Sequence, residues 1–190
     1  MTKFTDVMVD LETLGTAPGS VILSIGAVAF GIDAQEGAAW STFNSGPISV
    51  RSSRGFGLAI DESTLGWWLK QEAAAVCLLR AAFESDATPL TAALMNFNNW
   101  YPTGARLWGN GANFDNVLLR AVWQAAQPAG CTKPPWSYRD DRCYRTMKRV
   151  FPNVKEPPFD GVRHDALADA VHQTRHLVAL LNAVNGWEKS

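Results

Sequence analysis

Residues 6–12 of the chain read DVMVDLE, and residues 21–30 read VILSIGAVAF. The first run opens apolar and ends in acids, which predicts a β-strand, and the second is apolar and rich in β-branched residues, which predicts a buried β-strand. The stretch 38–44, AAWSTFN, predicts a third strand. Short links that carry Gly and Pro separate the three stretches, and links of this length join neighbouring strands most simply in the antiparallel sense. An antiparallel meander is therefore expected at the start of the sheet.

The rest of the chain predicts helices that alternate with short strands. Strands are expected at 105–109 and 136–139, and loops at 46–60, 128–135 and 152–163. Helices are expected at 64–71 with Asp61 as its cap, 72–83, 89–101, 113–126, 141–150 and 165–185. This order indicates an α/β fold, in which helices pack on a mixed sheet. We expect one domain that spans residues 1–190.

The composition is that of a globular protein, with 47% hydrophobic and 18% charged residues in a chain of 190. The formal net charge of −1 argues against broad phosphate binding across the surface. It does not argue against an enzyme that binds the end of a nucleic-acid strand through metal ions. Cys77, Cys131 and Cys143 form no CxxC pair, which argues against a disulfide framework or a thiolate zinc site. No signal peptide or membrane-spanning run is expected, so the predicted location is the cytoplasm.

The first candidate site lies at the end of the first strand, in VMVDLETLG. Asp10 and Glu12 are two residues apart, so on a strand both carboxylates point to the same face. Like charges this close repel each other unless a cation lies between them. Taken alone, the pattern is equally compatible with an exposed acidic strand end.

The second candidate lies in WGNGANFDNVLLRAV, where a strand-like run turns into a helix. Asp115 falls in the first turn of that helix, and Asn110, Gly111 and Phe114 surround the same turn. Small residues there allow a ligand to approach. On this segment alone, the simpler interpretation is that Asp115 complements the helix dipole.

The third candidate lies in GVRHDALADAVHQTRHL, at the start of the last helix. His164 precedes the helix, Asp165 is placed to cap it, and Asp169 lies inside it among alanines that leave room for a ligand. A loop histidine without a role is the alternative for His164. His172 and His176 are interpreted as ordinary polar helix positions.

The three segments together resemble the DEDD exonuclease superfamily in its histidine-bearing branch, which includes DnaQ-like proofreading exonucleases, oligoribonuclease and ribonuclease T. VDLETLG resembles the first motif of that family, NGANFDNVLL the second and HDALADA the third. The resemblance covers about residues 5–180, and TLGWWLKQ and DDRCYRT look closer to small stand-alone exonucleases of bacteria and phages.

The resemblance implies a ribonuclease H-like fold and an activity. By similarity, Asp10, Glu12, Asp115 and Asp169 ligate two Mg²⁺ or Mn²⁺ ions, and His164 is the general base. Such an enzyme hydrolyses phosphodiester bonds at the 3′ end of single-stranded RNA or DNA and releases nucleoside 5′-monophosphates. Four carboxylates suit hard divalent ions better than Cys or several His would, and His titrates near neutral pH.

Further residues are expected to contact the strand. Aromatic side chains can stack on unpaired bases, and Leu14 is expected to contact the terminal base. Trp67 and Trp68 are adjacent on a predicted helix. Because neighbouring helix residues face different ways, at least one of the two is expected in the core. The expected substrate contacts are Thr13, Leu14, Asn110, Phe114, Trp68 and Arg142, although a surface salt bridge is an equal alternative for Arg142.

Two other functions are compatible with the same fold. One is a non-catalytic module that docks on a polymerase or on nucleic acid, and the other is an endonuclease of the ribonuclease H type. The filled catalytic positions argue against the first, and the segment from His164 to Asp169 argues against the second. The predicted partner is a single-stranded RNA or DNA 3′ end, and the resemblance alone suggests a homodimer.

Overall fold

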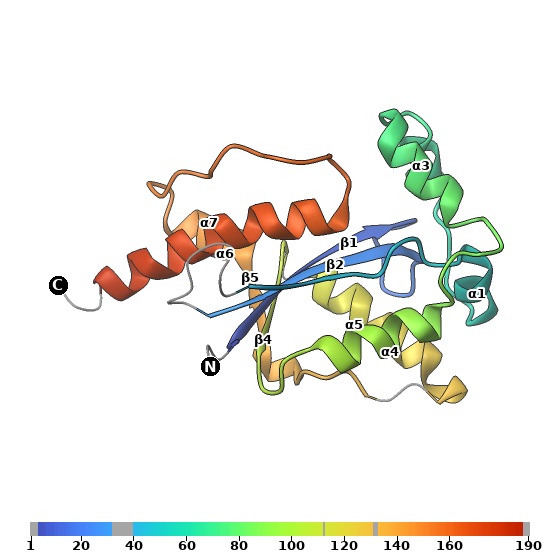
Figure 1. Ribbon diagram of the computed structural model, residues 1–190, viewed down its shortest axis with the longest axis horizontal. Helices are drawn as coiled ribbons and strands as arrows, with labels where there is room; N and C mark the ends of the chain where they lie inside the picture. Colours follow the sequence, from blue (N-terminus) through green and yellow to red (C-terminus); the bar gives the residue numbers. More distant parts are fainter. Residues whose placement is uncertain (1–3, 32–39, 112, 131–132, 188–190) are drawn as a thin grey trace.

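A five-stranded mixed sheet forms the centre of the computed structural model, which describes residues 4–31, 40–111, 113–130 and 133–187 (Figure 1). The strand order is β3-β2-β1-β4-β5. Strands β1, β2 and β3 pair antiparallel as the expected meander, and β4 and β5 join parallel to β1. The strands are β1 (Asp6–Thr13), β2 (Ile22–Phe30), β3 (Ser41–Asn44), β4 (Arg106–Gly109) and β5 (Asp141–Cys143).

Helices cover both faces of this sheet. The long α7 lies across one face, and α4 and α5 lie against the other (Figure 1). The helices are α1 (Val50–Gly55), α2 (Glu62–Trp68), α3 (Ala73–Ala81), α4 (Leu90–Trp100), α5 (Asp115–Ala126), α6 (Tyr144–Val150) and α7 (Ala166–Trp187), with short 3₁₀ helices at Gln127–Ala129 and Tyr138–Asp140. This arrangement confirms the expected α/β fold with a mixed sheet between helices.

Side chains of β1 alternate between two hydrophobic cores. Val7, Val9 and Leu11 belong to the core that includes α4 and α5, whereas Met8 belongs to the core beneath α7. Successive strand residues face opposite sides of a sheet. Asp10 and Glu12 therefore share the face of Met8 and point toward the side where α7 begins.

The start of α7 lies against the sheet because Gly26 has no side chain. Gly26 of β2 pairs with Asp10 of β1. A Cβ atom at Gly26 would collide with the backbone of Ala166 and Leu167. The missing side chain thus lets the first turn of α7 lie directly over the strand pair, close to Asp10.

Two expected boundaries were wrong. The segment 46–60, expected to be a loop, contains α1, which begins with a backbone N–H bond from Ser52 to the Ser49 side chain. The strand expected at 136–139 lies instead at Asp141–Cys143, where pairing with β4 creates a strand from the polar sequence DRC. Of the third strand expected at 38–44, residues 38 and 39 lie outside the described part of the chain, and β3 occupies Ser41–Asn44.

Two expected helix caps are confirmed. Asp61 accepts the backbone N–H of Thr64 at 2.8 Å, and Asp165 accepts that of Ala168 at 2.9 Å, so both aspartates act as helix caps. Cys77 and Cys143 carry free thiols, whereas Cys131 lies outside the described residues. Within the described segments, the helices are too short or too polar to span a bilayer.

Candidate active site

Three carboxylates from two elements converge where α7 begins. Asp10 and Glu12 project from the end of β1, and Asp169 reaches them from the first turn of α7. One oxygen of each lies within 4.8 Å of an oxygen of the others. The structure therefore joins the first and third candidate segments into one cluster.

Asp115 adds a fourth carboxylate from the start of α5. Its Oδ2 accepts the backbone N–H of Asn110 at 2.8 Å, so the turn between β4 and α5 holds it in place. Gly109 leaves room for this side chain, since a Cβ there would lie 3.0 Å from the Cβ of Asp115. Asn116 fastens the helix to the sheet by donating to the carbonyl of Leu107 at 3.1 Å.

Burial raises the pKa values of all four carboxylates, and repulsion from neighbouring carboxylates adds to the shift at Asp10 and Glu12. Burial, followed by repulsion from Asp115, Glu12 and Asp169, raises the pKa of Asp10 well above its usual range. Burial and the neighbouring carboxylates raise the pKa of Glu12 from 4.5 to about 8. Burial raises the pKa of Asp115 to about 6, although the backbone N–H of Asn110 opposes the shift, and burial also raises the pKa of Asp169.

The cluster fits divalent cations. In the part of the chain that the structure describes, no Lys or Arg forms an ion pair with any of the four carboxylates. The clustered donors are carboxylate oxygens, which hard ions such as Mg²⁺ prefer. Two such ions would neutralise the repulsion that raises these pKa values. Asp10, Glu12, Asp115 and Asp169 are the residues that would hold them.

His164 lies beside the cluster in a strained backbone conformation. Its φ of 62° is left-handed, which is uncommon for a residue other than Gly and turns the chain into α7. Its backbone N–H donates to Asp169 Oδ2 at 3.2 Å. Its ring packs edge-on against Trp67, with 5.0 Å between ring centroids, and against Trp68 at 6.2 Å. These contacts fix the imidazole next to a predicted metal ligand.

An opening of about 490 Å³ adjoins the carboxylates between β1 and α2. Glu12 lines it together with Thr13, Phe114 and Trp67. The indole of Trp67 is 44% exposed, so a flat aromatic surface borders the opening. The structure thus places Thr13 and Phe114, two of the expected substrate contacts, beside the cluster.

Three other expected contacts lie elsewhere. Trp68 is 1% exposed and its indole donates to the carbonyl of Thr13 at 2.8 Å, so the exposed tryptophan is Trp67. Leu14 is fully buried in the core and does not reach the opening. Arg142 donates to the carbonyls of Arg139 and Asp141, both at 2.9 Å. It forms no salt bridge with a described residue and does not line the openings that contain Glu12 or Asp169.

Two residues near the cluster, Gln173 and Arg145, were not predicted from the sequence. Gln173 donates to Asp10 Oδ1 at 2.6 Å. Its position four residues after Asp169 places both on one face of α7, and this spacing was a usable signal. Arg145 donates to the carbonyl of Asn110 at 2.7 Å and opposes the rise in the pKa of Asp115. Only the pairing of β5 with β4 brings it there, so no local pattern indicates it.

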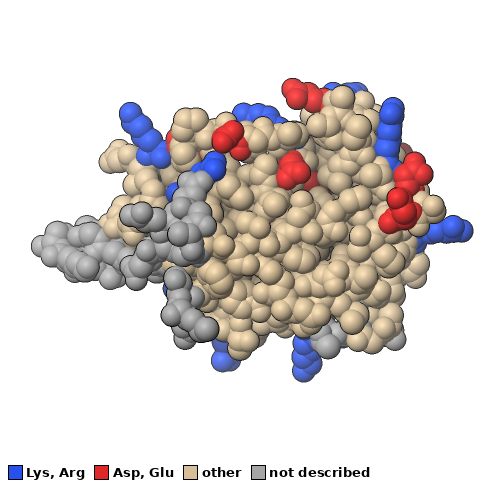
Figure 2. Space-filling view, in the orientation of Figure 1, with Lys and Arg blue, Asp and Glu red and all other residues tan. Residues whose placement is uncertain are grey.

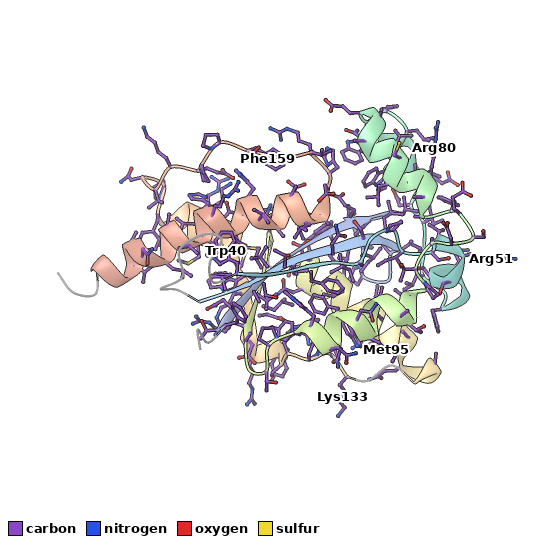
Figure 3. All side chains as sticks on the ribbon, in the orientation of Figure 1. Trp40, Arg51, Arg80, Met95, Lys133 and Phe159 are labelled. Carbon is purple, nitrogen blue, oxygen red and sulfur yellow. The ribbon has the colours of Figure 1, made fainter. Side chains whose placement is uncertain are left out.

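The other two histidines of α7 have structural contacts. His172 pairs with Glu156 at 3.1 Å and packs against Phe159, which lies on the segment above α7 (Figure 3). His176 is 2% exposed and lies 2.8 Å from the hydroxyl of Tyr144. His172 thus holds the segment before His164 against α7, and His176, which also lies 3.0 Å from the carbonyl of Val154, joins α7 to α6 and to that segment. These histidines are therefore more than polar surface positions.

Solved structures share this fold. The nuclease domain of 3′hExo, a DEDDh family member bound to rAMP, is 13% identical with a TM-score of 0.54, covering 96% of this chain and 95% of that one. A 3′-exonuclease described in 3′-end-specific recognition of histone mRNA stem-loop is 13% identical with a TM-score of 0.52, covering 95% and 84%. These matches confirm the expected ribonuclease H-like architecture. No curated protein sequence matches the chain.

A family model gives the activity. The model described as the 3′–5′ exoribonuclease Rv2179c-like domain matches residues 5–181, a range that contains all four carboxylates and His164. The resemblance to histidine-bearing DEDD exonucleases is thereby confirmed, together with 3′–5′ exonuclease activity on nucleic acid. The chain belongs to the Rv2179c-like family of 3′–5′ exoribonuclease domains.

Proposed function

We propose that this exonuclease removes nucleotides one at a time from the 3′ end of single-stranded RNA and releases nucleoside 5′-monophosphates, with Mg²⁺ or Mn²⁺ held by Asp10, Glu12, Asp115 and Asp169. The observation that carries the proposal is the convergence of four carboxylates without a balancing cation from the described residues. When bound, a pair of such ions supplies an activated water and stabilises the leaving 3′ oxygen. The choice of RNA follows the description of the matching family.

His164 would accept the proton of the attacking water. Imidazole is suited to this role because its ordinary pKa lies near neutral pH. The bond from its backbone to Asp169 and the packing of its ring on Trp67 keep it close to the cluster. It makes no bond through its ring to any of the four carboxylates within the described residues, so the imidazole remains available for proton transfer.

The terminal nucleoside would occupy the opening between β1 and α2. Trp67 and Phe114 offer aromatic surfaces on which an unpaired base can stack, worth about 1–3 kcal/mol per base. Thr13 lines the same opening, but its hydroxyl donates to the carbonyl of Gly15 at 2.8 Å. Thr13 therefore shapes the wall of the opening, while the aromatic side chains supply the contact area.

The polarity and products of digestion test this function. Single-stranded RNA blocked at its 3′ end by a phosphate should resist digestion in Mg²⁺, whereas a 5′ block should have no effect. Mononucleotides should appear from the first time point, and EDTA should stop their release. Internal fragments would indicate an endonuclease instead, and stable binding without any release would indicate a non-catalytic docking module.

We further propose that the protein is a homodimer, in line with the family resemblance. Light scattering on the purified protein should give twice the mass of the chain. A monomer that retains full activity would contradict this part of the proposal.

A further inference from the structure

We propose that a basic groove along α6 binds the backbone phosphates of the substrate strand upstream of the bond that is cut. The groove has a volume of about 670 Å³ and lies between α6 and the segment that follows it. Its basic side chains are Arg145, Lys148, Arg149 and Lys155. This inference rests on the proposed function, because the groove would bind the part of the substrate RNA that lies outside the active site.

The charge of this groove is not a consequence of a basic chain, because the formal net charge is −1. The surface drawn in Figure 2 likewise has a broad uncharged area, with charged side chains mainly at its rims. Four cations line the groove against one acid, Glu156. Glu156 is already paired with Lys148 at 2.7 Å and with His172 at 3.1 Å.

Arg149 and Lys155 are left without an ion-pair partner among the described residues. Neighbouring like charges repel, and an anion placed between them relieves the repulsion. Arg145 and Arg149 are one helical turn apart on α6, which puts their Cβ atoms about 5–6 Å from each other. A chain with a phosphate at every nucleotide suits such a row of cations better than a single small anion.

The groove is continuous with the active site. Asn110 lines it, and the backbone of Asn110 contacts both Asp115 and Arg145, at 2.8 Å and 2.7 Å. Asn110 also lines a neighbouring opening that contains Asp169 and Gln173. A strand whose scissile phosphate lies at the carboxylates therefore reaches the groove directly.

A second groove links the same cations to the nucleoside opening. Arg145 and Arg149 line it together with Phe114, which also borders the opening beside Trp67. The nucleoside opening itself has no Lys or Arg among the described residues that line it. The uncharged opening suits the terminal nucleoside, whereas the ridge of α6 suits the phosphates that precede it.

The test compares two double variants that change the net charge equally. Arg149→Gln with Lys155→Gln removes the two unpaired groove cations. Arg51→Gln with Lys133→Gln is the matched control, because these exposed residues lie on α1 and at the opposite edge of the molecule from α7 (Figure 3). Binding of 5′-labelled RNAs of 12 and 3 nucleotides is measured by fluorescence anisotropy in EDTA, where no cleavage occurs.

The groove variant should bind the 12-nucleotide RNA about tenfold more weakly at low salt, and its salt dependence should fall by about 0.7 in log–log slope for each phosphate that it no longer binds. The preference of the wild type for the longer RNA should shrink accordingly, and the control variant should behave like the wild type. Equal weakening for both RNA lengths, or by the control variant, would overturn the groove assignment. Wild-type protein that binds in this way but releases no mononucleotides in Mg²⁺ would refute the proposed function and leave the groove assignment standing.

Discussion

Acidic side chains lie at both ends of the buried strand β1, but they differ in the partners that the protein provides for them. At the beginning of the strand, Asp6 is fully buried and accepts bonds of 2.7 Å from the Arg106 guanidinium and the Trp108 indole. At the end of the strand, Glu12 is 8% exposed and Asp10 has Gln173 as its side-chain donor.

This difference separates a structural carboxylate from a functional one. Burial costs a carboxylate free energy unless a cation or several donors compensate. Asp6 receives that compensation from the protein itself, whereas burial and mutual repulsion raise the pKa values of Asp10 and Glu12. A buried acid therefore indicates a metal site only where the fold supplies no cation to balance its charge.

The largest effect is expected from neutralising the end of β1. Asp10→Asn with Glu12→Gln should lower the rate of mononucleotide release by more than the ~10²–10⁴-fold that a positioned acid or base contributes. The same variant should melt at a higher temperature than the wild type in EDTA, because the repulsion between the carboxylates is gone. Lower stability in EDTA would mean that these residues contribute favourable contacts that the structure does not show.

His164 should give the next largest effect. His164→Asn is the preferred variant, since Asn tolerates a left-handed φ better than Ala. We expect turnover to fall ~10²–10⁴-fold while the metal-induced rise in melting temperature stays close to that of the wild type. His172→Gln serves as the control and should keep turnover within about tenfold of wild type, because no proton transfer is assigned to it. A larger loss of turnover in His172→Gln than in His164→Asn would identify His172 as the general base instead.

The other end of β1 should respond in stability rather than in activity. Asp6→Asn leaves Arg106 without its partner, and we expect a loss of about 3 kcal/mol in the free energy of unfolding by urea. This is the lower part of the range for breaking a buried pair, because Arg106 is 34% exposed and retains contact with water. Turnover per folded molecule should hardly change. A large loss of turnover would mean that Asp6 contributes to catalysis as well as to stability.

Gln173 should give a smaller effect, confined to metal affinity. Its bond to Asp10 orients one carboxylate oxygen, and residues that orient a ligand typically contribute about 10–100-fold in metal affinity. Gln173→Leu should therefore raise the Mg²⁺ concentration needed for half-maximal activity by that factor, with less change in the maximal rate. Gln124→Leu, at an exposed position of α5, is the control. An unchanged Mg²⁺ requirement would remove this orienting role.

The sequence predicted those parts of the site that depend on local spacing. Asp10 and Glu12 lie two apart on a strand, and His164 lies just before a helix that carries Asp169, so local geometry alone gives their relative positions. The approach of Arg145 to Asn110 depends on β5 pairing with β4, which joins segments far apart in the chain.

The wrong predictions of substrate contacts at Trp68 and Leu14 concern which way a side chain faces. Trp67 and Trp68 have equal chemistry, and only the packing of α2 on the sheet decides that Trp68 is in the core. Leu14 comes after the β-bulge between Glu12 and Thr13, where the register of β1 shifts, and its side chain enters the core. Such orientations follow from tertiary contacts, which a pattern of residue types does not contain.

The melting temperature as a function of pH, with and without divalent ions, tests the central claim most directly. Burial and repulsion raise the pKa of Glu12 from 4.5 to about 8 and that of Asp115 from 3.8 to about 6 in the folded protein. The folded state therefore binds these protons more tightly than the unfolded state, so stability is greatest at low pH and is lost as pH rises through the folded pKa values.

In EDTA, the melting temperature should fall by several degrees between pH 5 and about pH 8.5, since about 1 kcal/mol corresponds to ~2–4 °C in a domain of this size. Mg²⁺ or Mn²⁺ added at the upper pH should restore it by binding the folded state. The Asp10→Asn, Glu12→Gln variant should show a smaller fall, because Asp115 is still present, and no response to divalent ions. A melting temperature that stays level or rises over this range in EDTA, with no response to divalent ions, would contradict the claim that these carboxylates form a metal site.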